Sequence, residues 1–136
     1  MSDGKAAHML DGRRILVVED EYFLADDLAR TLGRQGVEVV GPVGTLDAAV
    51  RLAEDETIDC AILDINLRGE MAFPVADRLD AAGIPFVFAT GYSRAVIPDR
   101  FSAVPHLEKP LETERVAELL SQAMAAAAGG GGSAAA

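Results

Sequence analysis

Acidic, hydroxyl and amine side chains occur where short apolar runs of this sequence stop. They are Glu19, Asp20, Asp64, Thr90 and Lys109. Carboxylates that are brought together repel one another, and the pKa of at least one rises unless a cation lies among them. Proteins usually hold Mg²⁺ with one or two carboxylates, water and a phosphoryl oxygen. The set therefore indicates phosphate chemistry that depends on Mg²⁺.

The other side chains of the set suit the transfer of a phosphoryl group. Lys109 supplies a mobile positive charge, and the Thr90 hydroxyl can donate a hydrogen bond to a phosphoryl oxygen. With the metal ion, both would neutralise charge that develops during transfer. We therefore interpret Asp64 as a carboxylate nucleophile that forms an aspartyl-phosphate.

Each residue also has an ordinary interpretation when it is considered alone. Asp20 would be a helix N-cap or a solvated loop residue. Thr90 with Gly91 would be a turn, and Lys109 would be an exposed loop cation. The functional interpretation depends on the combination, because four of the five predicted strands end in residues with roles in one reaction.

Five short apolar runs predict the strands that would position these residues. They cover residues 15–18, 37–40, 58–65, 85–89 and 104–107. Helical spacing of apolar residues predicts helices near residues 24–32, 46–53, 74–82 and 116–123. A further helix within residues 93–100 would be short or broken, because Pro98 lacks a backbone N–H.

Strands that alternate with helices predict a doubly wound α/β domain. Its five-stranded parallel sheet would be flanked by five helices through right-handed crossovers. Ligands bind such sheets beyond the carboxyl ends of the strands. The chemically capable residues are therefore expected to converge at one edge of the sheet.

Length and charge limit the classes of protein and partner. A chain of 136 residues is expected to form one domain. Its net charge of −10 would repel nucleic acid and anionic lipid, so neither is an expected direct partner. No strongly apolar run reaches the roughly 18 residues of a membrane span. Cys60 is the single cysteine, which favours a reducing, cytoplasmic location.

The two ends of the sequence lack the pattern of the central part. Residues 1–12 are expected to form an N-terminal extension, and residues 13–124 the folded domain. Residues 125–136 are rich in Ala and Gly and are expected to form a flexible tail, either natural or a cloning remnant.

Four motifs together resemble the receiver domain of bacterial two-component response regulators. They are ILVVEDE (15–21), AILDINL (61–67), FATGY (88–92) and LEKP (107–110). Their order and spacing agree with that family over essentially the whole predicted domain. The resemblance implies a flavodoxin-like receiver fold with strand order 2-1-3-4-5.

The resemblance also implies roles for individual residues. Asp64 corresponds to the phosphoacceptor, and Glu19 and Asp20 to the acidic pair that binds Mg²⁺. The backbone carbonyl of Asn66 corresponds to a further metal ligand.

Residues near the carboxyl ends of the later strands also match the family pattern. Thr90 corresponds to the switch hydroxyl and Lys109 to the lysine that pairs with the phosphoryl group. Pro110 is expected to follow a cis peptide bond. Tyr92 and Asn66 hold positions that in the family control how quickly water removes the phosphoryl group.

His106 departs from the family pattern. Receivers often carry Tyr or Phe three residues before the lysine, where its rotamer reports phosphorylation. His106 is therefore either a switch residue or simply a histidine at a strand end, and Tyr92 is a candidate for part of the switch role.

The motif FATGY resembles the FAT-GUY subgroup of alphaproteobacterial single-domain response regulators. This narrower resemblance implies a stand-alone signalling phosphoacceptor rather than an enzyme. Its partners would be a histidine kinase of the HWE/HisKA2-like type and a phosphotransfer or output protein. It also implies a link to general stress signalling.

Three alternative functions remain open at this point. An aspartate-nucleophile phosphohydrolase generally has a second Asp two residues after its nucleophile, where this sequence has Asn66. A flavodoxin-like cofactor protein would need a phosphate-binding loop after the first strand, where this sequence is acidic. A pseudo-receiver scaffold would bind its partner whether or not Asp64 is phosphorylated.

Overall fold

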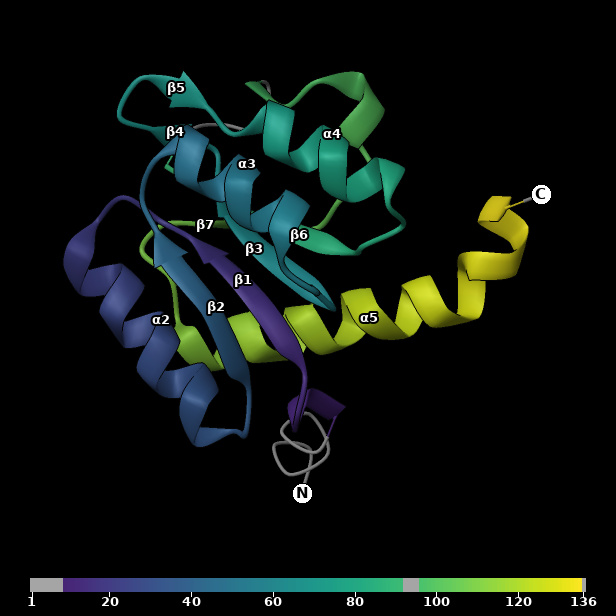
Figure 1. The fold of residues 1–136 in the computed structure, drawn as a ribbon, viewed down its shortest axis with the longest axis horizontal. Coiled ribbons are helices and arrows are strands. Elements are labelled where there is room, and N and C mark those ends of the chain that lie inside the picture. Colours follow the sequence, from purple (N-terminus) through teal and green to yellow (C-terminus); the bar gives the residue numbers. More distant parts are fainter. Residues whose placement is uncertain (1–8, 92–95, 136) are drawn as a thin grey trace.

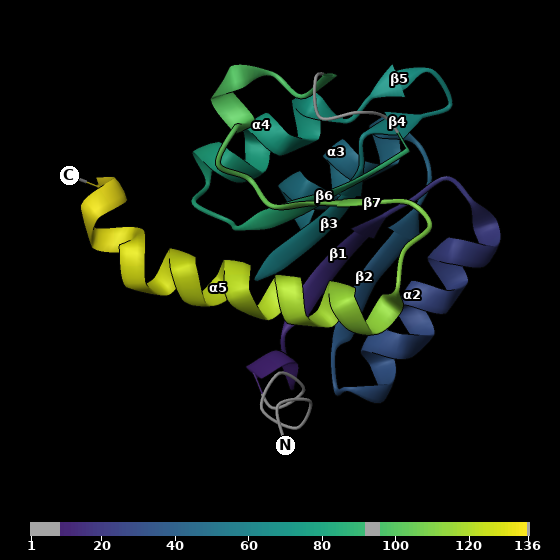
Figure 2. The ribbon, with the colours of Figure 1, turned by 180° about the vertical axis from the view of Figure 1, so that it is seen from behind.

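The computed structural model describes residues 9–91 and 96–135, which form a three-layer α/β fold (Figures 1 and 2). Five parallel strands form the central sheet in the order β2-β1-β3-β6-β7. They are β1 (Arg14–Val18), β2 (Glu38–Val43), β3 (Cys60–Asp64), β6 (Phe86–Thr90) and β7 (His106–Glu108). Counted along the chain, this order is 2-1-3-4-5, so the predicted parallel sheet and strand order are confirmed.

Helices cover both faces of the sheet. They are α2 (Tyr22–Arg34) and α5 (Thr113–Ala135) on one face, and α3 (Leu46–Asp55) and α4 (Phe73–Ala81) on the other. Successive side chains of a strand point to opposite faces. Ile15 of β1 accordingly packs in the cluster shared with α2 and α5, and Leu16 packs in the cluster shared with α3 and α4. A continuous apolar run therefore suits each central strand.

The number of helices differs from the prediction. Four α-helices flank the sheet within the described residues, whereas five were expected. Where the remaining helix was expected, the described part contains the 3₁₀ helix η2 (Asp99–Phe101), with Pro98 at its N-cap. Pro98 has no backbone N–H to donate, which disfavours a regular helix that runs through this position but is compatible with a place at the start of η2. Residues 92–95 of this segment lie outside the described residues.

Both predicted domain boundaries fall inside packed or helical structure. Leu10 belongs to the extension expected at residues 1–12, yet it is fully buried in the core cluster on the α2 and α5 face. At the other end, α5 continues beyond residue 124 into the Ala/Gly-rich segment. Alanine has the highest helix propensity, so an Ala-rich sequence favours continuation of a helix.

A short hairpin after β3 was not predicted. It pairs β4 (Asn66–Leu67) with β5 (Glu70–Met71) in antiparallel orientation. The two residues between these strands, Arg68 and Gly69, both have positive φ angles, 54° and 95°. Positive φ at both central residues is the requirement of a type I′ turn.

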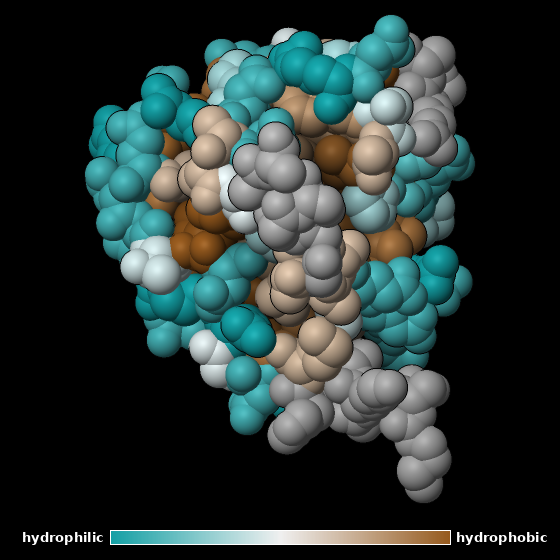
Figure 3. Space-filling model, turned by 90° about the vertical axis from the view of Figure 1, so that its right-hand side faces the viewer, coloured by the Kyte–Doolittle hydropathy of each residue, from teal (hydrophilic) through white to brown (hydrophobic). Residues whose placement is uncertain are grey.

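The outer surface is mixed in polarity. Figure 3 shows the side toward which α5 projects, where hydrophobic residues are visible near the centre and hydrophilic residues form the rim. In the described part of the chain, no helix combines the length and apolar character needed to span a bilayer.

Candidate metal and phosphoryl site

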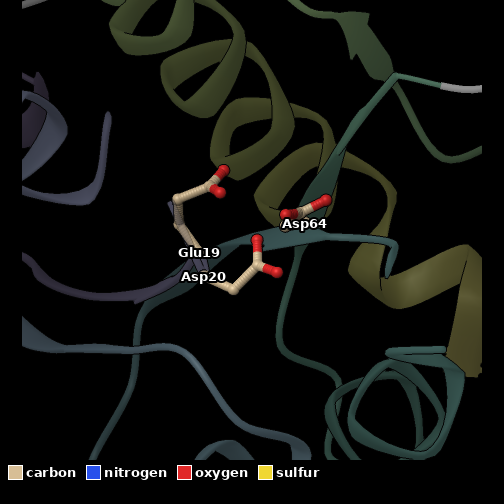
Figure 4. A group of neighbouring side chains, drawn as sticks. All are labelled: Glu19, Asp20 and Asp64. Atoms are coloured by element: carbon tan, nitrogen blue, oxygen red, sulfur yellow. The ribbon is translucent and has the colours of Figure 1, made fainter. Parts of the chain in front are cut away.

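Three carboxylates meet at the carboxyl ends of two neighbouring strands. Glu19 and Asp20 directly follow β1, and Asp64 is the last residue of β3. Val18 pairs with Leu63 in the sheet, which places the two strand ends side by side. One oxygen of each carboxylate lies within 4.8 Å of the others, around a common space (Figure 4). The convergence predicted for these three residues is therefore observed.

The surroundings of Asp64 disfavour its negative charge. Its exposed fraction is 4%, and that of Glu19 is 3%. Burial, followed by the charge of Glu19 and a hydrogen bond with Asp20, raises the pKa of Asp64 to about 8, although Lys109 opposes this shift. An additional cation would stabilise the ionised form of this carboxylate.

Lys109 brings positive charge to the carboxylates. Its Nζ lies 3.1 Å from Asp64 Oδ2, 3.0 Å from Glu19 Oε2 and 2.8 Å from Glu21 Oε2. Burial alone would lower the pKa of Lys109, but its ion pairs with these three carboxylates raise it above the usual value. The backbone N–H of Lys109 also donates to the carbonyl of Thr90 at 2.9 Å, which fixes the loop after β7 beside the end of β6.

The unpredicted hairpin holds two of the carboxylates. The backbone N–H of Asn66 donates to Asp64 Oδ1 at 3.3 Å, and that of Arg68 donates to Asp20 Oδ2 at 3.1 Å. The Asn66 side chain accepts a hydrogen bond from the backbone N–H of Gly69 at 2.7 Å and so supports the turn. The hairpin thus holds the carboxylates of Asp64 and Asp20 through backbone N–H donors.

The donor set fits a hard divalent cation. Glu19 Oε1 is buried and has no hydrogen-bond partner among the described residues, although a buried carboxylate oxygen normally has one. A cation bound between the carboxylates of Glu19, Asp20 and Asp64 would offset their repulsion. All three supply oxygen, the ligand atom that Mg²⁺ prefers.

The remaining predicted residues differ in how they relate to this site. Thr90 ends β6 and is fully buried. Lys109 and Pro110 are joined by a cis peptide bond, as predicted. His106 begins β7, where it pairs with Phe88 and is half-buried. Tyr92 lies outside the described residues.

Three residues near the site were missed by the sequence interpretation. Glu21 accepts a hydrogen bond from Lys109 Nζ, and the backbone N–H of Arg68 donates to the carboxylate of Asp20. A Cβ atom on Gly44 would lie only 3.2 Å from Asp20 Cα, so glycine permits close packing of the loop after β2. The acidic run 19–21 was a signal for Glu21, whereas the Gly44 contact depends on tertiary structure alone.

Comparison with curated proteins finds relatives that are longer than this chain. Sensory transduction protein LytT of Bacillus subtilis is 33% identical over 113 residues, which cover 80% of this chain and 47% of LytT. This chain spans about half the length of the curated relatives that it matches first.

Solved structures include similar chains of comparable length. SdrG from Sphingomonas melonis Fr1 is 44% identical with a TM-score of 0.71, over 88% of this chain and 98% of SdrG. The BeF₃-activated conformation of SdrG gives 45% identity and a TM-score of 0.66, over 79% and 92% of the two chains. A Burkholderia pseudomallei response regulator, solved with a phosphorylated aspartic acid, calcium ion and citrate, is 25% identical with a TM-score of 0.69, over 86% and 71%.

A family model agrees with these similarities and with the geometry of the site. The model described as the response regulator receiver domain matches residues 15–121. This match overlaps all five strands of the parallel sheet and includes the three converging carboxylates. The chain belongs to the response regulator receiver domain family.

Proposed function

We propose that this chain is a phosphorylation switch in which Asp64 accepts a phosphoryl group from a histidine kinase. Receiver domains bind Mg²⁺ at an acidic pocket and interact with histidine kinases in two-component systems. The main support in this chain is the contact between Lys109 Nζ and Asp64 Oδ2, 3.1 Å apart, beside two further carboxylates. A carboxylate nucleophile beside an amine and a cation site is suited to phosphoryl transfer.

In the proposed reaction, an Asp64 oxygen attacks phosphorus while the P–N bond to the kinase histidine breaks. The electron pair of that bond returns to the imidazole nitrogen, which then takes up a proton. Mg²⁺, held by Glu19, Asp20, Asp64 and the Asn66 carbonyl, would neutralise charge on the phosphoryl oxygens. Lys109 donates to one of these oxygens, and the Thr90 hydroxyl donates to another.

Two related structures support this proposal through their chemistry. SdrG was solved in a BeF₃-activated conformation, and the Burkholderia pseudomallei protein contains a phosphorylated aspartic acid with a calcium ion. We propose that Asp64 of this chain is phosphorylated like the aspartic acid of the Burkholderia pseudomallei protein. Modulation by Asn66, Tyr92 and His106 is part of the same proposal.

We further propose that the chain signals as a single-domain regulator, by protein contact or by phosphotransfer. SdrG supports this, since the similarity covers 98% of its chain. The FATGY motif favours a kinase of the HWE/HisKA2-like type and a role in general stress signalling. The single cysteine, Cys60, favours a cytoplasmic location.

Phosphotransfer from a radiolabelled kinase tests the reaction. Wild-type protein with Mg²⁺ is expected to become labelled, and Asp64→Asn is expected to remain unlabelled because an amide is a poor nucleophile. Asp80→Asn, which alters an exposed residue of α4, is the matched control and should label normally. Labelling of Asp64→Asn would contradict the proposed site.

Beryllofluoride binding separates the switch from a scaffold. A phosphorylation switch should bind its partner with different affinity when beryllofluoride occupies Asp64. Equal affinity with and without beryllofluoride would favour the scaffold.

A further inference from the structure

Glu21 makes an ion pair with the lysine of the phosphoryl site although it is neither a phosphoacceptor nor a predicted metal ligand. Its Oε2 lies 2.8 Å from Lys109 Nζ, the shortest of the three contacts of this amine. Glu21 precedes α2, and Lys109 follows β7, so the contact joins segments 88 positions apart. The Glu21 side chain makes no capping hydrogen bond to α2.

The contacts of Lys109 use its full donor capacity. A lysine ammonium has three N–H donors, and Glu19, Glu21 and Asp64 each accept one. A phosphoryl group on Asp64 adds anionic oxygens that also require donors. Lys109 can donate to them only when one of its present contacts is released.

Burial indicates which contact is released most easily. The side chains of Glu19 and Asp64 are 1% and 5% exposed, so water cannot readily take the place of Lys109 at either carboxylate. The Glu21 side chain is 61% exposed, and water can replace the lysine there. Exchange of Glu21 for the phosphoryl group is therefore the least unfavourable rearrangement.

From this geometry we infer that Glu21 is a positioning residue that competes with the phosphoryl group for Lys109. This inference rests on the proposed function of Asp64. In the unphosphorylated protein, Glu21 holds the third donor of Lys109. Because Glu19 and Asp64 hold the amine in place without it, removal of the Glu21 charge frees a donor and leaves Lys109 beside the site.

Beryllofluoride affinity of Glu21→Gln tests this competition. The substitution keeps the size of the side chain and removes its charge. With Mg²⁺ saturating, we expect beryllofluoride to bind about twofold to fivefold more tightly than to wild type, the range for loss of an exposed ion pair. Glu70→Gln removes the same charge from an exposed residue of β5 and should leave the affinity unchanged.

A second measurement uses metal-free protein. Lys5 and Lys109 are the only lysines of the sequence, so ¹⁵N labelling of lysine gives two side-chain signals. Glu21→Gln should shift the Lys109 signal and leave the Lys5 signal in place, whereas Glu70→Gln should shift neither. An unchanged Lys109 signal would show that the Glu21 contact is not formed.

The outcomes distinguish this inference from the proposed function. If wild-type protein binds no beryllofluoride, both fail. If wild type binds and Glu21→Gln binds equally or more weakly, only the competition is wrong. If Glu21→Gln and Glu70→Gln gain beryllofluoride affinity equally, the effect comes from net charge, and the proposed competition for Lys109 is also wrong.

Discussion

At the scale of single residues, the fold places Asp64 where its charge is unfavourable before any ligand binds. Strand β3 ends inside the core, so Asp64 is buried beside Glu19, and Lys109 only partly offsets the resulting rise in pKa. A buried carboxylate that favours its neutral form is ready to gain from a cation. Burial of Asp64 beside Glu19 therefore destabilises the metal-free protein and favours binding of a cation.

The raised pKa of Asp64 predicts a dependence of stability on pH. A carboxyl whose pKa rises from 3.8 to about 8 on folding stabilises the folded state at low pH, and this contribution is lost as pH rises through about 8. In metal-free protein, the free energy of unfolding should thus decrease between about pH 4 and about pH 8, and it should decrease more in wild type than in Asp64→Asn. Urea denaturation at several pH values measures the difference, and identical pH profiles would contradict it.

At the scale of elements, η2 is attached to the sheet by aromatic packing. Phe101 is 2% exposed, and its ring centroid lies 5.9 Å from Phe73, 5.9 Å from Phe86 and 5.6 Å from Phe88. These residues come from α4 and β6, so one side chain fastens the segment before β7. Since β6 ends at Thr90, whose carbonyl accepts a hydrogen bond from the backbone N–H of Lys109, this packing also supports the strand beside Lys109.

Loss of the Phe101 ring is expected to destabilise the domain strongly. Phe101→Ala should lower the free energy of unfolding by about 3–5 kcal/mol, because it removes buried surface and leaves a cavity. Phe101→Leu keeps much of the volume and should lower it less. Denaturant unfolding of both variants measures the effect, and equal losses would contradict the explanation by buried volume, because leucine fills most of the space that alanine leaves empty.

The beginning of α2 presents two exposed aromatic residues beside the site. Tyr22 and Phe23 are 76% and 84% exposed, with ring centroids 5.5 Å apart. Tyr22 also lines a cavity of about 290 Å³ together with Asp20 and Arg68. Exposed aromatic side chains are frequent anchors of protein interfaces. Their position favours contact with the protein that donates the phosphoryl group.

Removal of one aromatic residue should therefore separate two kinds of phosphodonor. Phe23→Ala is expected to slow phosphotransfer from the kinase about tenfold, the effect of losing roughly 1.4 kcal/mol of interface energy. Phosphorylation by a small acyl phosphate should be unchanged. Met71→Ala, at a residue that is 40% exposed, is the control. Equal slowing with both donors would contradict a docking role for Phe23.

The spacing of apolar residues, and the polar residues that end apolar runs, predicted most of the helices and strands because these signals lie within short segments of the sequence. The apolar run at residues 15–18 and the acidic residues after it correctly placed β1 and Glu19. The β4–β5 hairpin escaped prediction because a two-residue turn of Arg68 and Gly69 lacks the usual Asn-Gly signal. Burial of Leu10 escaped too, because its partners in the core come from distant segments.

At the scale of the whole molecule, the net negative charge and the carboxylates of the site both destabilise the folded state by repulsion. A net charge of −10 makes the folded state repel itself, and three carboxylates of the site concentrate part of this repulsion. Any salt screens the general part. Lys109 offsets part of the local repulsion, and a cation bound among Glu19, Asp20 and Asp64 would offset more of it.

Thermal unfolding at matched ionic strength in NaCl and MgCl₂ should distinguish these two contributions. Both salts are expected to raise the Tm, but MgCl₂ should raise it further, because an ion that binds only the folded state adds about 2.7 kcal/mol at 100 times its Kd. Asp20→Asn should lose the additional stabilisation by Mg²⁺ and keep the response to NaCl. Asp55→Asn, which alters an exposed residue of α3, should retain both. If Asp20→Asn keeps the full response to Mg²⁺, the ion acts on the charge of the molecule as a whole and not at the three carboxylates.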